Sequence, residues 1–398
     1  MNSHYKKFFI LSLIGIFIGI VVGFLATIFG KTLIEITKIR DENTFIFIPF
    51  LAIAGIFIVY IYKKWGGKAT KGMSLIFEVA QNKEKKIPLR LIPFIILTTW
   101  FTHLFGGSAG REGVSVQIGA TFSNWLGEKL KIENCKKIFL ITGMAAGFSG
   151  LFQTPIAAIF FAVEVLIVGK IHYFSLLPAT LASFTASFVS NFLGLEKFTS
   201  PLNIAINFDL ITILKLIILG IIFGLVGFIF SFTLKFFKSY FDKKFKSPFL
   251  KIFIISIFLS FIFLLIHNGR YSGLGTNLIN FSFNGGQIYF YDWALKLLLT
   301  VITLSIGFQG GEVTPLFAIG ASLGVFLASV FNLPIQFVAC LGYLSVFGSA
   351  TNTFLAPIFI GGEVFGFNYM PFFFIVMVFA YTFNFNKSIY SLQELDNL

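Results

Sequence analysis

The chain sets two opposite charges between glycines in the stretch Gly110-Arg111-Glu112-Gly113-Val114. The twenty residues 91–110 contain no Asp, Glu, Lys or Arg. A charged side chain at the centre of a membrane helix is unfavourable by about 2.5–3.5 kcal/mol even on lenient insertion scales, so a carboxylate kept there is a candidate functional group. Flanking glycines also let backbone N–H groups come close to a ligand. Glu112 is therefore the first residue to which we assign a functional role.

The composition predicts a protein whose solvent is lipid. Of its 398 residues, 57% are hydrophobic and 12% are charged, which leaves too little polar surface for a water-soluble protein. Uncharged runs of about 20 residues, enough for a spanning helix, are 8–30, 44–62, 91–110, 138–163, 171–195, 216–234, 252–269 and 364–386. A further run, 313–362, has 50 residues and predicts two or more spans or half-spans. Because backbone polar groups in lipid must be satisfied within the chain, we expect an all-α polytopic membrane protein.

The net charge of +13 does not indicate nucleic-acid binding, because the basic residues follow a membrane topology. Segment 63–90 has eight basic and two acidic residues, segment 235–251 has six and one, and segment 31–42 has three of each. Basic loops stay on the cytoplasmic side of a membrane. We predict a multi-pass protein of the cell inner membrane, with both termini and both basic segments in the cytoplasm and 31–42 outside.

Neither a metal nor a cofactor is expected. Cys135 and Cys340 alone form no disulfide framework and no metal site. The first apolar run lacks the small-residue cleavage site of a signal peptide, and only eight residues follow Tyr390. We predict one transmembrane domain over residues 1–398 without a cytoplasmic regulatory domain.

The sequence contains an internal duplication. Gly110-Arg111-Glu112-Gly113 precedes Ile118-Gly119-Ala120, and Gly310-Gly311-Glu312-Val313 precedes Ile319-Gly320-Ala321. Thr154-Pro155-Ile156 with Glu164 is likewise matched by Ala356-Pro357-Ile358 with Glu363. We predict two repeats, about 8–205 and 206–398, in which Glu312 is the counterpart of Glu112.

Three motifs have the sequence of a helix start inside the membrane. They are GREG at 110–113, GGEVTP at 310–315 and QTP at 153–155, and Pro is well accommodated in a first helical turn. A helix N-terminus has up to four free N–H donors and about half a positive charge. In duplicated membrane proteins such broken helices aim their N-termini at anions near the midplane. Without an Asp-rich cluster, the set predicts an anion site. The alternative is that the glycines only pack helices together.

The motifs resemble those of the CLC family of anion channels and anion/proton exchangers. The segments that carry the resemblance are GGSAGREGVSVQIG (106–119), GMAAGF (143–148), PIAAIF (155–160), GGEVTPLFAIG (310–320) and NKSIYS (386–391). The resemblance implies two inverted-topology repeats whose broken helices meet at a mid-membrane anion site. It also implies a homodimer with one pore per subunit, a transport protein rather than an enzyme, and an anion-coordinating role for Tyr390. The two site motifs include Gly110, Arg111, Gly310, Gly311 and Pro315.

Departures from the usual CLC pattern resemble the fluoride-exporting branch of the family. Met73 stands where a serine hydroxyl usually contacts chloride, and Val114 replaces a proline. Glu312 and Thr314 stand where apolar residues are usual. Val165 stands where chloride/proton exchangers keep an inward-facing glutamate. Together these changes imply a fluoride/proton antiporter that exports F⁻ from the cytoplasm in exchange for H⁺ and confers fluoride resistance.

Each candidate residue then has an expected role. Glu112 is the protonatable gate, and Glu312 replaces the missing inward glutamate as a second proton carrier. We interpret Arg111 as structural or anion-attracting rather than as a salt-bridge partner of Glu112, because neighbouring residues on a helix do not face each other. The expected fluoride donors are the N–H groups of Gly113, Val114, Glu312 and Val313 and the hydroxyls of Thr314 and Tyr390. Met73 joins the anion site on the resemblance alone.

The other ionisable residues of the apolar runs are expected to be structural. Glu164 and Glu363 mark interfaces. His103, His172 and His267 are expected to be hydrogen-bonded or interfacial rather than catalytic.

Two alternative functions remain. Within transport, the chain fits a chloride/proton exchanger or a passive anion channel. Outside transport, Ser108 within G-x-S-x-G and Ser149 within GFSG are similar to the motifs of an intramembrane serine hydrolase, with His267 as the base. Such short patterns arise easily among 37 glycines. A hydrolase also leaves the duplication unexplained, so it is the more distant alternative.

Overall fold

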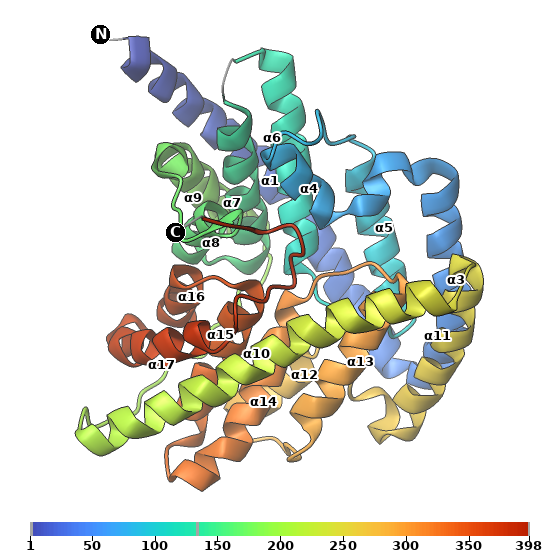
Figure 1. The fold of residues 1–398 in the computed structure, drawn as a ribbon, viewed down its shortest axis with the longest axis vertical. Coiled ribbons are helices and arrows are strands. Elements are labelled where there is room, and N and C mark those ends of the chain that lie inside the picture. The colour runs from blue at the N-terminus through green and yellow to red at the C-terminus, as the bar shows by residue number, and fades with distance from the viewer. Residues whose placement is uncertain (1–2, 133–134, 397–398) are drawn as a thin grey trace.

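The computed structural model describes residues 3–132 and 135–396, nearly all of them in helices or their connections (Figure 1). The first half contains α1 (Ser3–Glu42), α2 (Thr44–Phe47), α3 (Leu51–Ile61), α4 (Met73–Ala80), α5 (Leu91–Leu104), α6 (Glu112–Leu130), α7 (Lys136–Phe152), α8 (Pro155–Glu164) and α9 (Leu176–Phe192). The second half contains α10 (Leu210–Lys244), α11 (Pro248–Leu265), α12 (Thr276–Asn284), α13 (Asp292–Ile306), α14 (Val313–Phe331), α15 (Ile335–Thr351), α16 (Leu355–Phe365) and α17 (Met370–Thr382).

Short elements connect these helices. They are η1 (Ile48–Phe50), η2 (Tyr62–Gly66), η3 (Gly67–Lys71), η4 (Tyr173–Ser175), η5 (His267–Gly269), η6 (Phe367–Tyr369) and the strands β1 (Ile167–Val168) and β2 (Glu394–Leu395). The two strands pair in parallel, which ties the C-terminal segment to the end of α8. The chain ends predicted to be cytoplasmic lie outside the described residues.

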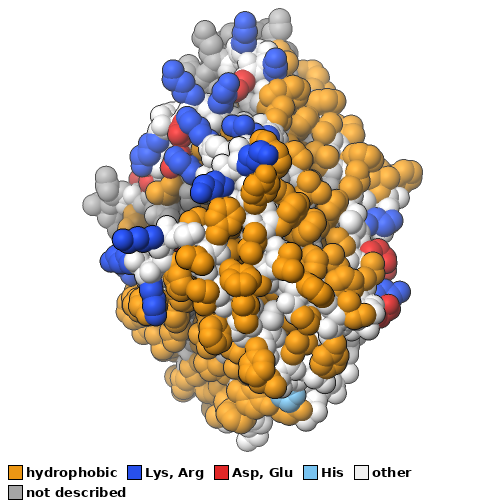
Figure 2. All heavy atoms as spheres, turned by 90° about the vertical axis from the view of Figure 1, so that its right-hand side faces the viewer, with side chains coloured by type: hydrophobic (Ala, Val, Ile, Leu, Met, Phe, Trp, Pro, Cys, Tyr) orange, Lys and Arg blue, Asp and Glu red, His pale blue; other side chains and the backbone are white. Residues whose placement is uncertain are grey.

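The helices are those of a membrane protein. Within the described residues, six helical segments are long and apolar enough to span a membrane: 9–42, 44–80, 173–192, 210–244, 248–265 and 313–331. Hydrophobic side chains cover most of the face in Figure 2, and Lys and Arg gather along its upper left edge. The prediction of an all-α polytopic membrane protein is confirmed.

Two predicted spans are wrong as continuous helices. Residues 91–110 give only the 14 residues of α5, followed by a loop that leads to Gly110, and residues 138–163 break between α7 and α8. The run 313–362 breaks after α14 and again after α15, which agrees with the prediction of two or more spans or half-spans. At two of these breaks Gln153 and Asn352 have φ values of 56° and 53°. This left-handed conformation ends the preceding helix, and a hydropathy pattern does not register it.

The two halves repeat the same helix pairs. α6 and α14 each have 19 residues, and α7 and α15 each have 17. α6 packs on α7, and α14 packs on α15. At the first crossing Gly119 faces Gly143, and at the second Gly320 faces Gly342, so closely that an added Cβ would overlap the opposite carbonyl oxygen. Close approach through small residues is typical of membrane helices. Glycine packing therefore explains these four residues but not the charged motifs.

Candidate functional site

The two glycine motifs meet between the halves. The Gly110 N–H donates to the Gly311 carbonyl oxygen at 2.5 Å, and the Gly311 N–H donates to the Gly110 carbonyl oxygen at 2.8 Å. These bonds form an isolated antiparallel bridge. α6 and α14 each begin two residues after the bridge glycine and run toward opposite ends of the molecule (Figure 1). The bridge therefore brings together two helix N-termini from different halves.

The bridge corrects the predicted pairing of the two glutamates. Counting from the paired glycines, Arg111 corresponds to Glu312, and Glu112 corresponds to Val313. The sequence match is wrong by one residue, because it aligns the third position of GREG with that of GGEV rather than the glycines that pair. Glu112 is the first residue of α6, whereas Glu312 precedes α14 as its N-cap residue. The two acids therefore hold different places at their helix starts.

The Glu112 carboxylate lies at the start of the opposite helix, α14. Its Oε2 accepts hydrogen bonds from the Thr314 hydroxyl at 2.5 Å, the Thr314 N–H at 3.2 Å and the Arg111 N–H at 3.3 Å. Only 1% of the residue is exposed. Free N–H groups and the positive end of the helix dipole favour an anionic group at this point. The carboxylate thus engages donors of the kind expected to bind the transported anion.

The expectation that Arg111 and Glu112 do not interact is wrong. Arg111 Nε lies 3.6 Å from Glu112 Oε1. The rule that neighbouring helical residues point apart does not apply, because Arg111 precedes the helix, with φ of −131°. Neither atom forms a hydrogen bond within the described part of the chain. The Arg111 guanidinium group therefore attracts the Glu112 carboxylate through charge, and the hydrogen bond between the two residues comes from the Arg111 backbone N–H.

Glu312 faces a large cavity, called the vestibule below. The vestibule has a volume of about 770 Å³ and is lined by residues of α4, α6, α10, α11 and α13 and of the segments before α14 and after α17. Of the predicted site residues, those that line it are Met73, Gly113, Gly310, Glu312 and Tyr390. The two basic segments of the sequence, around Lys71 and Lys235, also meet at this cavity. They therefore lie on one face of the molecule, as the predicted topology requires.

Tyr390 is held with its hydroxyl unused. Its ring packs against Phe77 at a centroid distance of 5.4 Å, and its buried Oη has no hydrogen-bond partner among the described residues. Three residues later, Gln393 Nε2 donates to the carbonyl oxygens of Val165 and Thr351 at 2.9 and 3.2 Å. The C-terminal segment is thereby anchored, and Tyr390 keeps a free donor at the edge of the vestibule.

The remaining predicted residues lie behind the vestibule. Val114, Val313, Thr314 and Pro315 are buried. The Val114 N–H donates to the Arg111 carbonyl oxygen at 3.2 Å, so this donor is engaged in the first helical turn. The Thr314 hydroxyl is engaged by Glu112.

The sequence reasoning missed Gln117, one turn along α6 from Gly113. Gln117 lines the vestibule, and its buried Oε1 has no hydrogen-bond partner in the part of the chain described. Residues four apart lie on the same face of a helix. The spacing from Gly113 is therefore the signal that identifies it.

A buried lysine was also missed. Lys296 of α13 is fully buried, and its ammonium donates to Ser108 Oγ at 2.9 Å and to the carbonyl oxygens of Tyr271 and Gly273 at 3.1 and 2.7 Å. These bonds attach the loop before Gly110 to the segment before α12. The available signal was a single charge in the otherwise uncharged stretch 293–311.

Glu164 and Glu363 form a reciprocal pair of helix caps. The Glu164 carboxylate accepts the first N–H groups of α16 at 2.9 and 3.2 Å, and the Glu363 carboxylate accepts the first N–H groups of α8 at 2.9 and 3.2 Å. α8 and α16 pack on each other, so both acids have a structural role as caps between two packed helices. Neither lines the vestibule.

The histidines are hydrogen-bonded, which confirms the expectation for them. His103 Nε2 lies 3.4 Å from the Gly110 carbonyl oxygen, His172 Nδ1 2.7 Å from Ser175 Oγ, and His267 Nε2 2.9 Å from the Tyr291 hydroxyl.

Ser108 and Ser149, the candidate nucleophiles of a serine hydrolase, are also hydrogen-bonded. Ser108 Oγ lies 2.8 Å from Thr300 Oγ1, and Ser149 Oγ donates to the Ser183 carbonyl oxygen at 2.8 Å. Within the described residues neither serine is hydrogen-bonded to a histidine, so the expected pairing of a serine with His267 as its base is not formed.

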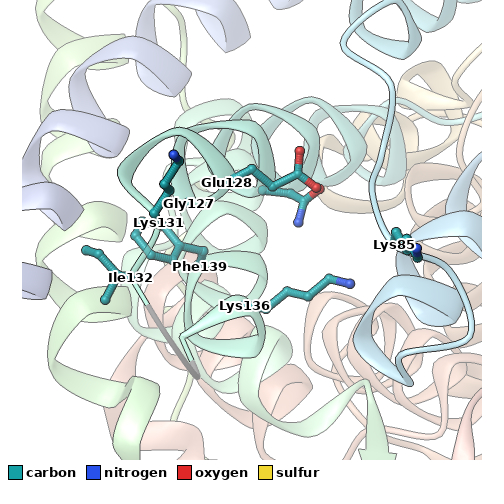
Figure 3. Close-up of a pocket in the computed structure, with 8 residues that line it drawn as sticks. Lys85, Gly127, Glu128, Lys131, Ile132, Lys136 and Phe139 are labelled. Atoms are coloured by element: carbon teal, nitrogen blue, oxygen red, sulfur yellow. The ribbon is translucent and has the colours of Figure 1, made fainter.

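A second cavity, of about 220 Å³, lies at the other end of α6 (Figure 3). It is lined by Lys85, Glu128 and Lys136 among others. Glu128 is 16 residues after Glu112, or about 24 Å along the helix at about 1.5 Å per residue. This surface hollow is therefore separate from the site at the helix starts.

Fold and site together define a membrane protein of the anion-transport class, in which two halves bring charged helix starts to one point. The family profile described as "Voltage gated chloride channel" matches residues 54–384. The chain belongs to this family, the CLC family, and the assignment made from its motifs is confirmed.

Individual relatives agree with this assignment. The chain is 30% identical over 385 residues to the "Chloride/fluoride channel protein" of Pseudomonas syringae pv. tomato, covering 95% of this chain and 85% of that protein. It is similar to the crystal structure of a CLC-type fluoride/proton antiporter, with 52% identity, a TM-score of 0.97 and 100% coverage of both chains. A slow cyanobacterial Cl⁻/H⁺ antiporter shares the fold, with 18% identity, a TM-score of 0.82 and 94% coverage of both chains.

Proposed function

We propose that this protein is a fluoride/proton antiporter that exports F⁻ from the cytoplasm in exchange for H⁺. The observation that carries the proposal is the buried Glu112 carboxylate, held by the hydroxyl and N–H of Thr314 at the start of α14. The Glu112 carboxylate occupies the donors that a small anion would bind in its place. The 52% identity to a CLC-type fluoride/proton antiporter supports fluoride as the anion.

Exchange follows from competition for these donors. A fluoride ion that reaches Thr314 displaces the Glu112 carboxylate, which then lacks its two hydrogen bonds from Thr314. A buried carboxylate without partners is unfavourable as an anion, and it is stabilised by binding a proton. The protonated side chain leaves the site to the ion. The proton is taken from the outside, to which the ion departs. The carboxyl group then returns to Thr314 as an anion and releases its proton toward Glu312 on the vestibule side.

Glu312 is the proposed second proton carrier, on the vestibule side. Its Oε2 lies 3.8 Å from the position of a Cβ added to Gly113, the residue that follows the gate. Val165 is buried, and the Glu164 carboxylate is committed to α16. These positions leave Glu312 as the acid that lines the vestibule next to the start of α6.

Fluoride selectivity is proposed to come from strong donors at the site. The hydroxyls of Thr314 and Tyr390 and the N–H groups at the starts of α6 and α14 supply them. Met73 lines the vestibule, and its thioether donates no hydrogen bond, so it does not add a donor suited to chloride at that position.

We further propose that the protein is not an enzyme and functions as a homodimer in the cell inner membrane with cytoplasmic termini. Residues 8–205 and 206–398 are the proposed repeats. The basic segments that share one face support the orientation.

Purified protein in liposomes loaded with fluoride tests the function. We expect electrode-detected F⁻ efflux, slow Cl⁻ efflux, and uphill H⁺ movement driven by an F⁻ gradient. Equal F⁻ and Cl⁻ rates would favour the chloride/proton exchanger. Fluoride flux without proton movement would favour the passive channel.

Two substitutions assign the carboxylates. Glu112→Gln cannot be protonated or deprotonated and should abolish proton coupling. Glu312→Gln should lower the rate of proton movement more than it weakens the binding of fluoride. If Glu112→Gln still pumps protons, the gate is another residue.

A further inference from the structure

One face of α10 carries unpaired positive charge into the vestibule. Ser231, Lys235, Lys238 and Asp242 all line this cavity. They are spaced by three or four residues, so they form one stripe along the helix. Glu312 lines the same cavity as the stripe.

The lysines around the vestibule differ in their partners. Lys71 pairs with Glu78 at 2.7 Å, and Lys251 pairs with Asp242 at 2.7 Å. Lys235, Lys238 and Lys243 form no salt bridge with any described residue, and all three are exposed. Lys235 and Lys238 belong to the stripe, and their two positive charges therefore remain in a concave space with protein walls. Such a space focuses the field and concentrates anions.

Lys238 also acts on the inner acid. Lys238 and Glu312 line the same cavity, so the ammonium charge attracts the Glu312 carboxyl group across it. An ionised Glu312 by itself would repel an anion that approaches the start of α14, and a nearby ammonium group offsets that repulsion. The lysine charge therefore allows an ionised Glu312 and a passing anion to occupy the same cavity.

We propose that Lys235 and Lys238 form a collecting site for small monovalent anions, which receives cytosolic fluoride before it reaches Thr314. This inference rests on the proposed function and concerns the step before gate displacement. The site raises the local concentration of the ion and leaves the proton-coupling groups unchanged. It therefore sets the apparent KM for internal fluoride, not the ratio of F⁻ to H⁺.

Charge-neutral variants test this assignment in proteoliposomes. For Lys238→Gln and Lys235→Gln we expect the apparent KM for fluoride on the vestibule side to rise by about 3- to 10-fold, since one charge is removed from a field that concentrates ions by about 10-fold or more. The maximal rate and the coupling ratio should stay unchanged. Lys244→Gln is the matched control: it lies on the same helix and removes the same charge, but its ammonium faces Tyr240 and not the vestibule.

A charge-rescue experiment separates charge from side-chain packing. The native Cys135 and Cys340 are buried, so Lys238→Cys can be modified selectively before reconstitution. A cationic thiosulfonate reagent should restore the wild-type KM, and an anionic one should raise KM further. High concentrations of an impermeant salt should reduce these differences, because the screening length falls from about 10 Å at 0.1 M to about 3 Å at 1 M.

The outcomes distinguish this inference from the function on which it rests. A KM for Lys238→Gln equal to that for Lys244→Gln, or a Lys238→Cys variant that responds equally to both reagents, would overturn the collecting site while leaving transport intact. Wild-type protein without fluoride transport would overturn the proposed function instead.

Discussion

Replacing Thr314 by Val tests whether fluoride and Glu112 compete for one hydroxyl. The substitution keeps the shape of the side chain and removes the donor that lies 2.5 Å from Glu112 Oε2. A hydrogen bond to a charged group contributes about 1.5–3 kcal/mol, which is about 10- to 150-fold in an equilibrium constant. In the wild-type site the same hydroxyl stabilises both the ion and the carboxylate that the ion displaces. The two losses oppose each other, so we expect fluoride affinity to change by less than about threefold.

The Glu112→Ala background removes the competitor. There, Thr314→Val should weaken fluoride binding by the full amount, about 10- to 150-fold. Isothermal titration calorimetry of the four proteins in detergent, at one pH and ionic strength, gives the required dissociation constants. Thr303→Val serves as the control in both backgrounds, because that hydroxyl is buried and donates to the Leu299 carbonyl oxygen in its own helix. An equal effect of Thr314→Val in both backgrounds would refute the competition and, with it, the role of Glu112 as a stand-in for the ion.

Four further substitutions test the packing and hydrogen bonds around the site. Gly320→Ala places a Cβ against the backbone of Gly342 and should destabilise the protein by about 1–3 kcal/mol, seen as a lower midpoint of thermal aggregation in detergent. Lys296→Met leaves the Tyr271 carbonyl oxygen without its donor and the Gly273 carbonyl oxygen with only the Ala109 N–H. The loss of about 1–3 kcal/mol should shorten the half-life of transport activity on heating; an unchanged half-life would show that water replaces the ammonium. Glu164→Gln and Glu363→Gln should each lower stability by about 0.5–2 kcal/mol through a weaker helix cap, and the two losses should be similar because the caps are reciprocal.

The sequence predicts helix starts better than helix ends. Charged or proline-containing motifs announce the starts of α6, α8 and α14 within one residue of their observed positions. The breaks after α7 and α15 depend on left-handed residues at Gln153 and Asn352. Neither residue is glycine, and both stand in uncharged runs, so hydropathy does not locate either helix end.

Tertiary pairing decides what the site residues do. Sequence alone selects Glu112, Thr314 and Glu312 as candidates, but the bond between Glu112 and Thr314 joins residues of different halves. The register between the halves is set by two backbone hydrogen bonds at glycines, which carry no side-chain signal. That is why the predicted match of the two glutamates is wrong by one residue. Gln117 and Lys296 were not predicted for a related reason. Gln117 matters because it faces the vestibule, and Lys296 matters because it joins two loops, and neither fact can be read from the sequence.

The opposed starts of α6 and α14 have a consequence for the response to membrane voltage. Each helix contributes about half a positive charge at the site and about half a negative charge at its far end. Because the helices leave the bridge in opposite directions (Figure 1), their dipole moments largely cancel along the line that joins those ends, while their positive ends add at the site. A strong attraction for an anion is thus built without a net dipole for the transmembrane field to act on. We expect the voltage sensitivity of transport to come from the ion, the protons and the carboxyl groups that move, at about 2.3 kcal/mol per elementary charge for each 100 mV crossed.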